Sequence, residues 1–157
     1  TQWKSECDRD GWILLAPEAA DPKQWNRTEL PLVRKLIDQI VADYAIDPTR
    51  IVLAGRGAGG AMALLAASQN RDVVRGVAVL DSPLPPAVAP NEPLERLAFY
   101  VARAAKSPHA SSVEKGIEQL RKAKYPVTVK DLGDDPRPLE PAERAELSRW
   151  VDCLDRL

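Results

Sequence analysis

The sequence is poor in the residues that build metal sites. Among its 157 residues it has one histidine, His109, and two cysteines, Cys7 and Cys153. Zinc and related ions are usually held by several histidine or cysteine ligands at short spacings, and this chain has no such cluster. We therefore expect no metal and no cofactor. The two cysteines, near opposite ends of the sequence, are either free thiols or one disulfide.

Long apolar runs and an excess of charge of one sign are also missing. No run approaches the roughly 20 apolar residues that a membrane-spanning helix needs. The 22 basic and 23 acidic side chains give a formal net charge of −1, which provides no electrostatic attraction for nucleic acid or an acidic membrane. The sequence thus predicts neither partner, and it carries no signal from which a compartment can be inferred.

The composition that remains is that of an ordinary globular protein, 45% hydrophobic and 29% charged. The chain is long enough for one domain with a core of its own, so we interpret residues 1–157 as a single domain. Because it starts at Thr1 without a methionine, we expect it to be a fragment or C-terminal domain of a longer polypeptide. The other domains of that polypeptide are its expected partners, and self-association into a homo-oligomer is left open.

Apolar runs alternate with helical patterns along most of the chain. Trp12–Ala16 is a continuous apolar run, which predicts a strand covered on both faces. The motif Ser111-Ser112-Val113-Glu114 predicts a capping box at a helix start. Further strands are predicted at 51–55, 73–80, 96–102 and 126–132, with helices at 30–44, from the turn at 57 to about 68, after 111 and from 141 onward. Strands separated by helices predict an α/β fold, a parallel sheet of about five strands with helices on both faces.

The centre of this pattern is Arg50–Ala67, where a β-branched run ends in a glycine cluster that opens a helix. Glycine is needed there because strand and helix come close together at a sharp reversal. Amides at a helix N-terminus favour anions, and open α/β sheets bind ligands at the carboxyl ends of their strands. We therefore predict a binding site for a small carboxylate or a peptide C-terminus at this edge. Its candidate residues are Arg56, Gly57, Ala58, Gly59 and Asp81.

The segment Gly55-Arg56-Gly57-Ala58-Gly59 resembles the Gly-x-Ser-x-Gly nucleophile elbow of α/β-hydrolases. The flanking residues 46–51 and 60–63 are similar to those of esterases related to polyhydroxybutyrate depolymerases and feruloyl esterases. The resemblance implies an α/β-hydrolase-like fold and matches the C-terminal two-thirds of it, without the N-terminal strands. In that fold a third strand lies between the fourth and fifth, so either upstream residues supply it or Trp12–Ala16 pairs directly with Ile51–Gly55.

The sequence departs from this resemblance at each position that carries the chemistry. Gly57 stands where the nucleophilic serine is expected. The loop after the strand at 96–102 has no carboxylate for the acid, and the loop Gly133–Arg137 has no histidine for the base. His109 lies in a different loop. We therefore predict that the chain is not an enzyme but a pseudoenzyme domain with a structural, protein-interaction or ligand-binding role.

The same glycines support an alternative from another class of protein. Gly55-x-Gly57-x-x-Gly60 has the spacing of a dinucleotide-binding fingerprint between a strand and a helix, and Asp81 ends the next strand, where a ribose-binding carboxylate is expected. That fingerprint normally opens the first βαβ unit, whereas here a strand and a long helix precede it. A Rossmann-type domain is therefore the second interpretation.

Overall fold

The computed structural model describes residues 2–21, 24–85 and 87–157. Its sheet has four parallel strands in the order β1-β2-β3-β4. The strands are β1 (Val52–Arg56), β2 (Gly76–Leu80), β3 (Ala98–Arg103) and β4 (Val127–Asp131). The helices are α1 (Lys4–Asp10), α2 (Leu30–Asp43), α3 (Ala58–Gln69), α4 (Ala110–Lys122) and α5 (Pro141–Asp152), with short 3-10 helices η1 (Arg27–Glu29) and η2 (Leu154–Arg156).

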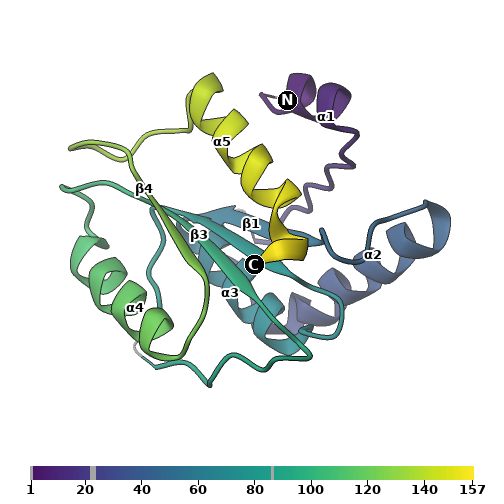
Figure 1. Ribbon diagram of the computed structural model, residues 1–157, viewed down its shortest axis with the longest axis horizontal. Coiled ribbons are helices and arrows are strands. Elements are labelled where there is room, and N and C mark those ends of the chain that lie inside the picture. The colour runs from purple at the N-terminus through teal and green to yellow at the C-terminus, as the bar shows by residue number, and fades with distance from the viewer. Residues whose placement is uncertain (1, 22–23, 86) are drawn as a thin grey trace.

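Helices cover both faces of the sheet, with α1 and α5 on one side and α2, α3 and α4 on the other (Figure 1). Because successive side chains of a strand point to opposite faces, each strand contributes to the core on both sides of the sheet. Val77 and Val79 of β2 face the layer of α3 and α4, whereas Ala78 between them faces Trp150 of α5. Gly76 makes room for that indole, because an added Cβ there would lie 2.8 Å from the ring. The predicted α/β class and its central strands are confirmed.

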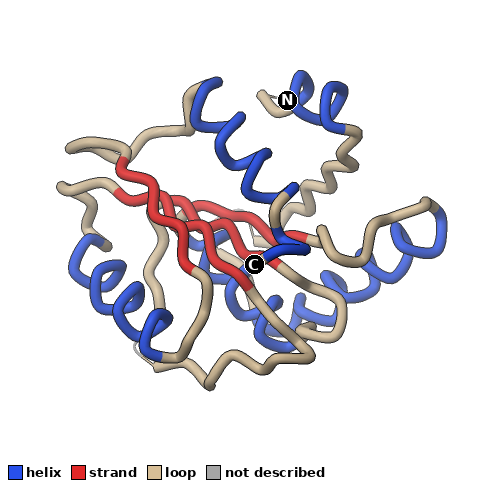
Figure 2. The backbone as a smooth tube through the Cα atoms, in the orientation of Figure 1, coloured by secondary structure: helices blue, strands red, loops and turns tan. Residues whose placement is uncertain are grey.

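The strand predicted at Trp12–Ala16 does not form. These residues are extended, as the tan tube after α1 shows (Figure 2), but they join no strand of the described chain. Ile13, Leu14 and Leu15 are each nearly half exposed. A strand needs a hydrogen-bonded neighbour as well as apolar side chains, and among the described residues β1 pairs only with β2. The direct pairing of Trp12–Ala16 with the elbow strand is therefore also wrong, and the sheet has four strands instead of about five.

The two cysteines lie on separate helical ends. Cys7 is in α1 and Cys153 is the residue that follows α5, and both are free thiols. The disulfide alternative is therefore not formed in this structure. The two helices are instead joined by polar contacts. Arg144 of α5 donates to Glu6 of α1 at 2.8 Å.

An ion pair at the start of α5 makes the stability of the fold depend on pH in the acidic range. Arg137 donates two hydrogen bonds, of 2.6 and 2.8 Å, to the buried carboxylate of Glu143, which lowers the Glu143 pKa to about 2. Because this pKa lies below the ordinary 4.5, the pair stabilises the fold above about pH 4.5 and its contribution is lost as the pH falls toward 2.

We expect Arg137→Gln to lower the urea midpoint at pH 7 by more than it does at pH 2.5, because at pH 2.5 the carboxyl of Glu143 is protonated in the unfolded state and most of the stability that the ion pair contributes is already lost. Urea unfolding followed by tryptophan fluorescence at pH 7, 4 and 2.5 measures this difference. Lys106→Gln is the control, since the Lys106–Asp134 pair is two-thirds exposed and contributes little. An equal loss at all three pH values would contradict the linkage.

Candidate functional site

A sharp turn joins the end of β1 to the start of α3. Arg56 ends the strand, Ala58 opens the helix, and Gly57 between them has φ 54° and ψ −121°. L-residues adopt this conformation only with strain. An added Cβ at Gly57 would meet no atom within 4 Å. The position therefore points into open space at the carboxyl edge of the sheet, where ligands of open α/β folds bind.

Two other glycines of the turn are required by packing. A Cβ on Gly55 would overlap the carbonyl group of Gly59 and lie 2.5 Å from the Gly60 nitrogen. A Cβ on Gly60 would lie 2.5 Å from the Ser82 hydroxyl. Strand and helix thus touch through their backbones. This contact explains the glycine spacing without a bound dinucleotide.

Asp81 lies beside this turn. Leu80, its neighbour before it, accepts a hydrogen bond from the Gly57 amide at 3.3 Å. Ser82, its neighbour after it, donates one to the Gly57 carbonyl at 2.7 Å. Asp81 itself has φ 46°, which is uncommon for a residue other than glycine. Both flanks of Asp81 are thus tied to the backbone of Gly57, and its own backbone is held in a rarely populated conformation.

Ser107 fixes the carboxylate of Asp81. Its hydroxyl donates a hydrogen bond to Asp81 and accepts one from the His109 amide at 3.0 Å. Ser107 is buried and lies just ahead of α4, which begins at Ala110. The capping box predicted at Ser111 is therefore wrong, because Ser111 is already inside the helix. The sequence did not predict Ser107 as a site residue. The one feature that could have indicated it is its position shortly before the start of a helix.

Arg56 is the available cation at this edge. It is exposed and makes no hydrogen bond or ion pair with any part of the chain that the structure describes. Arg103, at the end of β3, is instead engaged by Glu114 and by Asp131, the latter at 2.6 Å. The amides of Ala58 and the residue after it belong to the first helical turn, whose N–H groups have no partner within a helix. Arg56 and these amides offer positive charge beside Gly57.

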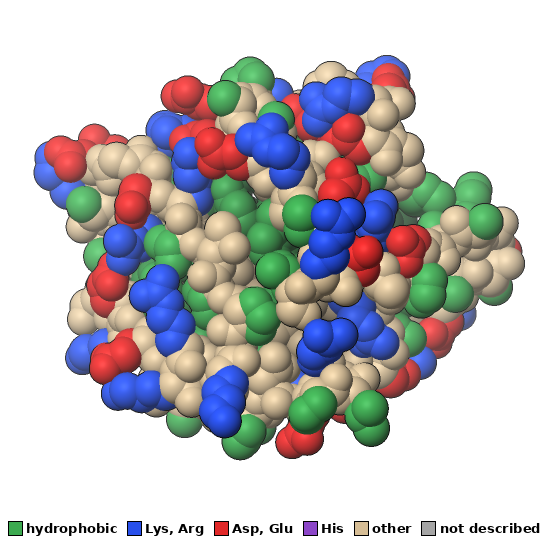
Figure 3. Space-filling view, in the orientation of Figure 1, with side chains coloured by type: hydrophobic (Ala, Val, Ile, Leu, Met, Phe, Trp, Pro, Cys, Tyr) green, Lys and Arg blue, Asp and Glu red, His purple; other side chains and the backbone are tan. Residues whose placement is uncertain are grey.

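Neither a metal centre nor a membrane element is found within the described ranges. No group of three or more His, Cys, Asp or Glu side chains is arranged to hold a metal ion among residues 2–21, 24–85 and 87–157. No helix of the described chain combines the length and hydropathy of a membrane span. On the face drawn in Figure 3, basic and acidic side chains are interspersed over the helices, without a large patch of one sign.

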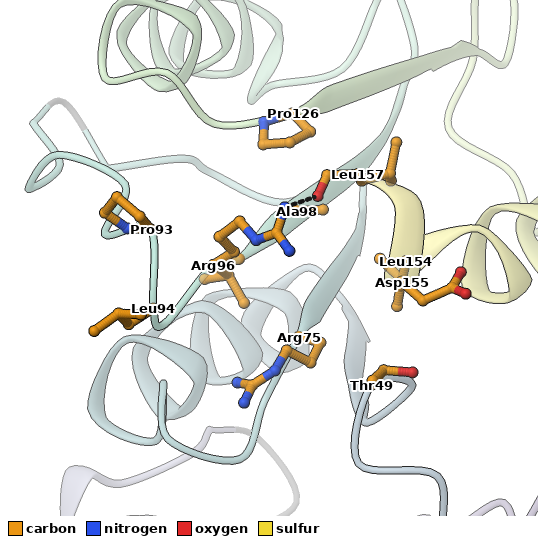
Figure 4. A pocket seen from close by; sticks show the side chains of 11 residues that line it. Thr49, Arg75, Pro93, Leu94, Arg96, Ala98, Pro126, Leu154, Asp155 and Leu157 are labelled. Carbon is orange, nitrogen blue, oxygen red and sulfur yellow. Dashed lines mark hydrogen bonds between the residues drawn. The ribbon is translucent and has the colours of Figure 1, made fainter.

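A cavity of about 220 Å³ lies at the opposite end of the strands, where they begin. Its walls come from the residues just before the strands, including Arg75 ahead of β2 and Pro126 ahead of β4 (Figure 4). Arg96 projects into it but donates to the Leu157 carbonyl at 3.0 Å. This cavity is at the amino ends of the strands, so it is separate from the site around Gly57.

No family model matches the chain. NocK of Nocardia uniformis subsp. tsuyamanensis, which is named as an esterase, is 31% identical over 94 residues, which are 58% of this chain and 27% of NocK. The chain thus spans about a quarter of the length of this relative.

Several solved structures share the arrangement of strands and helices. The Bacillus cereus carboxylesterase superposes with a TM-score of 0.60 at 17% identity, over 90% of this chain and 72% of that chain. SOBER1 of Arabidopsis thaliana gives a TM-score of 0.60 at 15% identity, over 80% and 62%. A phospholipase/carboxylesterase from Dyadobacter fermentans gives 0.59 at 18% identity, over 78% and 61%. The chain has the α/β-hydrolase fold. Of the proteins that it resembles, NocK, the Bacillus cereus protein and the Dyadobacter fermentans protein are named as esterases, and the dinucleotide-binding alternative is not favoured.

These comparisons contradict the prediction that the chain is not an enzyme. The sequence relative and several of the solved structures are named as esterases or hydrolases, which points to an enzyme. Vacant serine, acid and histidine positions in one elbow pattern do not exclude hydrolysis, because a carboxylate such as Asp81 can act as a general base without them. The binding residues Arg56, Gly57, Ala58, Gly59 and Asp81 remain predictions.

Proposed function

We propose that the chain is an esterase-like hydrolase domain that cleaves small carboxylic esters at the turn around Gly57, with water as the nucleophile. The proposal rests above all on Asp81, a carboxylate held at positive φ beside Gly57, where a side chain would project into open space. Backbone strain of this kind is concentrated at functional sites. The named esterases among the similar proteins support the reaction class.

In the proposed reaction Asp81 is the general base. Its carboxylate takes one proton from a water molecule as the water oxygen attacks the ester carbonyl carbon. The carbonyl oxygen becomes negative and is stabilised by the free amides at the start of α3, the helix that begins at Ala58. The tetrahedral intermediate then releases the alcohol, which receives the proton, and leaves the carboxylic acid. Ser107 keeps Asp81 oriented through its hydroxyl.

Arg56 is proposed to select the substrate. Its guanidinium is exposed at the same end of the strands and has no partner among the residues that the structure describes, so it is placed to bind a carboxylate carried by the acyl group. The ligand-binding role predicted from the sequence is retained in this form. We also propose that the domain works within a longer polypeptide, since the matched part of NocK is 27% of that protein.

The test is hydrolysis of p-nitrophenyl acetate and of the mono-p-nitrophenyl ester of succinate. Gly57 offers no hydroxyl to acylate, so we expect steady turnover without a burst of p-nitrophenol and without inactivation by phenylmethylsulfonyl fluoride. Arg56→Gln should raise KM for the succinate ester about tenfold and leave the acetate unchanged. Arg103→Gln, at the end of β3, is the matched control.

Two results would overturn the proposed function. Hydrolysis no faster than in buffer would exclude an esterase acting on simple esters. A stoichiometric burst followed by inactivation with the sulfonyl fluoride would assign the reaction to a covalent nucleophile elsewhere in the chain.

A further inference from the structure

The first turn of α3 is bordered by an indole ring from another part of the chain. A Cβ on Gly59 would lie 3.9 Å from the indole nitrogen Nε1 of Trp25. A Cβ on Gly60 would instead meet the hydroxyl of Ser82. Because consecutive residues of an α-helix point about 100° apart, Trp25 and Ser82 lie on different sides of this turn. Asp81 adjoins Ser82, so the proposed base and the indole flank the start of α3 from two sides.

The indole N–H of Trp25 is free to bind a ligand. It makes no hydrogen bond within the part of the chain that the structure describes. It also reaches solvent, since the buried side-chain nitrogen and oxygen atoms without a partner, among the described residues, are those of Tyr100 and Trp150. An indole nitrogen can only donate. A ligand at this place must therefore present an acceptor, and both oxygens of an ester are acceptors.

The ring of Trp25 is held in place by packing. It is half-buried and packs against the cluster of Leu30, Met62 and Ala66. Met62 and Ala66 belong to α3. The helix whose first amides are proposed to hold the ester oxygen thus also carries the surface that holds the indole, so the ring is fixed relative to those amides.

The loop that carries Trp25 is closed by one carboxylate. Glu29 accepts hydrogen bonds from the Ala20 amide at 2.8 Å and from the Asn26 amide at 2.6 Å. These two backbone bonds lower the pKa of Glu29, so it is charged at neutral pH. The side chain of Asn26 in turn accepts from the Thr28 amide at 3.0 Å and caps η1. The indole N–H is therefore positioned before a substrate binds, as electrostatic stabilisation of a transition state requires.

We propose that the indole N–H of Trp25 is a further oxyanion donor of the ester-cleaving site, beside the amides at the start of α3. The inference rests on the proposed function, because it concerns the oxygen that becomes negative when water attacks the ester carbonyl. A donor placed where charge develops lowers the barrier more than it tightens substrate binding. Asp81 takes the proton from water on one side of the turn, and Trp25 stabilises the negative oxygen from the other.

Trp25→Phe tests the donor, because phenylalanine keeps an aromatic ring against α3 and removes the N–H. We expect kcat for p-nitrophenyl acetate to fall about 10²-fold, the lower end of what the loss of one oxyanion donor costs, with KM within about twofold of the wild type. Trp12→Phe is the matched control. Trp12 packs on the other face of the sheet, in the cluster of Trp150, so this variant should keep the wild-type kcat. Thermal midpoints measured by circular dichroism establish that both variants are folded.

An NMR titration tests the same donor without turnover. Each of the four tryptophans gives one indole N–H resonance in a ¹⁵N–¹H correlation spectrum, and Trp25→Phe identifies the resonance of Trp25. The probe is p-nitrophenyl methylphosphonate, whose tetrahedral anion resembles the intermediate of ester hydrolysis. We expect a saturable shift of the Trp25 resonance. The resonances that should keep their positions belong to the indoles on the other face of the sheet, Trp3, Trp12 and Trp150.

Three results would contradict the assignment of Trp25. A kcat in Trp25→Phe within about threefold of the wild type would show that the indole N–H does not stabilise the transition state. A rise of KM alone would make Trp25 an apolar wall of the site. A phosphonate that shifts the amides of Ala58 and Gly59 but not the indole would place the oxyanion out of its reach.

A failure of the proposed function would look different, because the wild-type protein itself would then hydrolyse neither ester. The phosphonate titration would in that case decide about Trp25 alone. A saturable shift of its resonance would retain the indole as a donor to a tetrahedral anion, and an unmoved resonance would exclude it.

Discussion

Replacing Gly55 by alanine should strongly destabilise the fold, whereas the same replacement at Gly59 should leave its stability nearly unchanged. The Cβ of an alanine at position 55 would overlap the carbonyl group of Gly59 and approach the Gly60 nitrogen to 2.5 Å. These are backbone atoms, so no change of rotamer relieves the overlap. Strand β1 and helix α3 would have to separate. We expect a loss of at least about 4 kcal/mol, which is a large part of the roughly 5–15 kcal/mol that stabilises a typical domain.

Gly59 is the matched control because it belongs to the same glycine cluster as Gly55 and lies in the first turn of α3. The nearest atom to a Cβ there is the Trp25 indole nitrogen at 3.9 Å, an ordinary van der Waals contact. Alanine is the better helix former by roughly 1 kcal/mol, so Gly59→Ala should be neutral or slightly stabilising. Soluble yield, circular dichroism and urea midpoints of both variants measure the difference. A Gly55→Ala protein that unfolds at the wild-type midpoint would show that strand and helix are not in backbone contact.

The turn around Gly57 was predictable because its signal is local. A β-branched run, glycines at short spacing and helix formers stand next to one another in the sequence, and the structure has strand, turn and helix at those residues. The segment Trp12–Ala16 has an equally clear local pattern, yet it forms no strand. Whether an apolar run becomes a strand depends on a neighbour supplied from far along the chain, and no local pattern encodes that neighbour.

The residues of the candidate site also fall into those that a local pattern predicts and those that only tertiary contacts define. Arg56 and Asp81 were placed at the carboxyl edge by the rule that ligands bind where parallel strands end, and they lie there. The bond from Ser107 to Asp81 joins residues 26 apart in sequence. The strained φ of Asp81 and the ties of its neighbours to Gly57 are likewise tertiary features. Roles that arise from such contacts could not be read from residue types.

Asp81→Asn should reduce kcat/KM for p-nitrophenyl acetate by about 10²–10⁴-fold, the usual contribution of a general base. Asparagine removes the base with little else changed. It has nearly the same shape, its amide oxygen can still accept the Ser107 hydrogen bond, and it tolerates positive φ as well as aspartate does. The thermal midpoint should therefore stay close to that of the wild type, which separates a loss of chemistry from a loss of fold.

Asp131→Asn is the matched control for this prediction. Asp131 is the last residue of β4, so it lies at the carboxyl ends of the strands as Asp81 does, but it pairs with Arg103 at 2.6 Å. Its turnover should remain within about twofold of the wild type. If Asp81→Asn retained a third or more of the wild-type kcat/KM while Asp131→Asn behaved as expected, Asp81 would not be the base. The strained backbone at Asp81 would then serve only to connect β2 to the loop that follows, and another group would have to take the proton from water. If kcat/KM fell strongly in Asp81→Asn alone, the nucleophile would be a water molecule that Asp81 activates beside the elbow turn. In that case the turn needs no hydroxyl of its own to attack the ester.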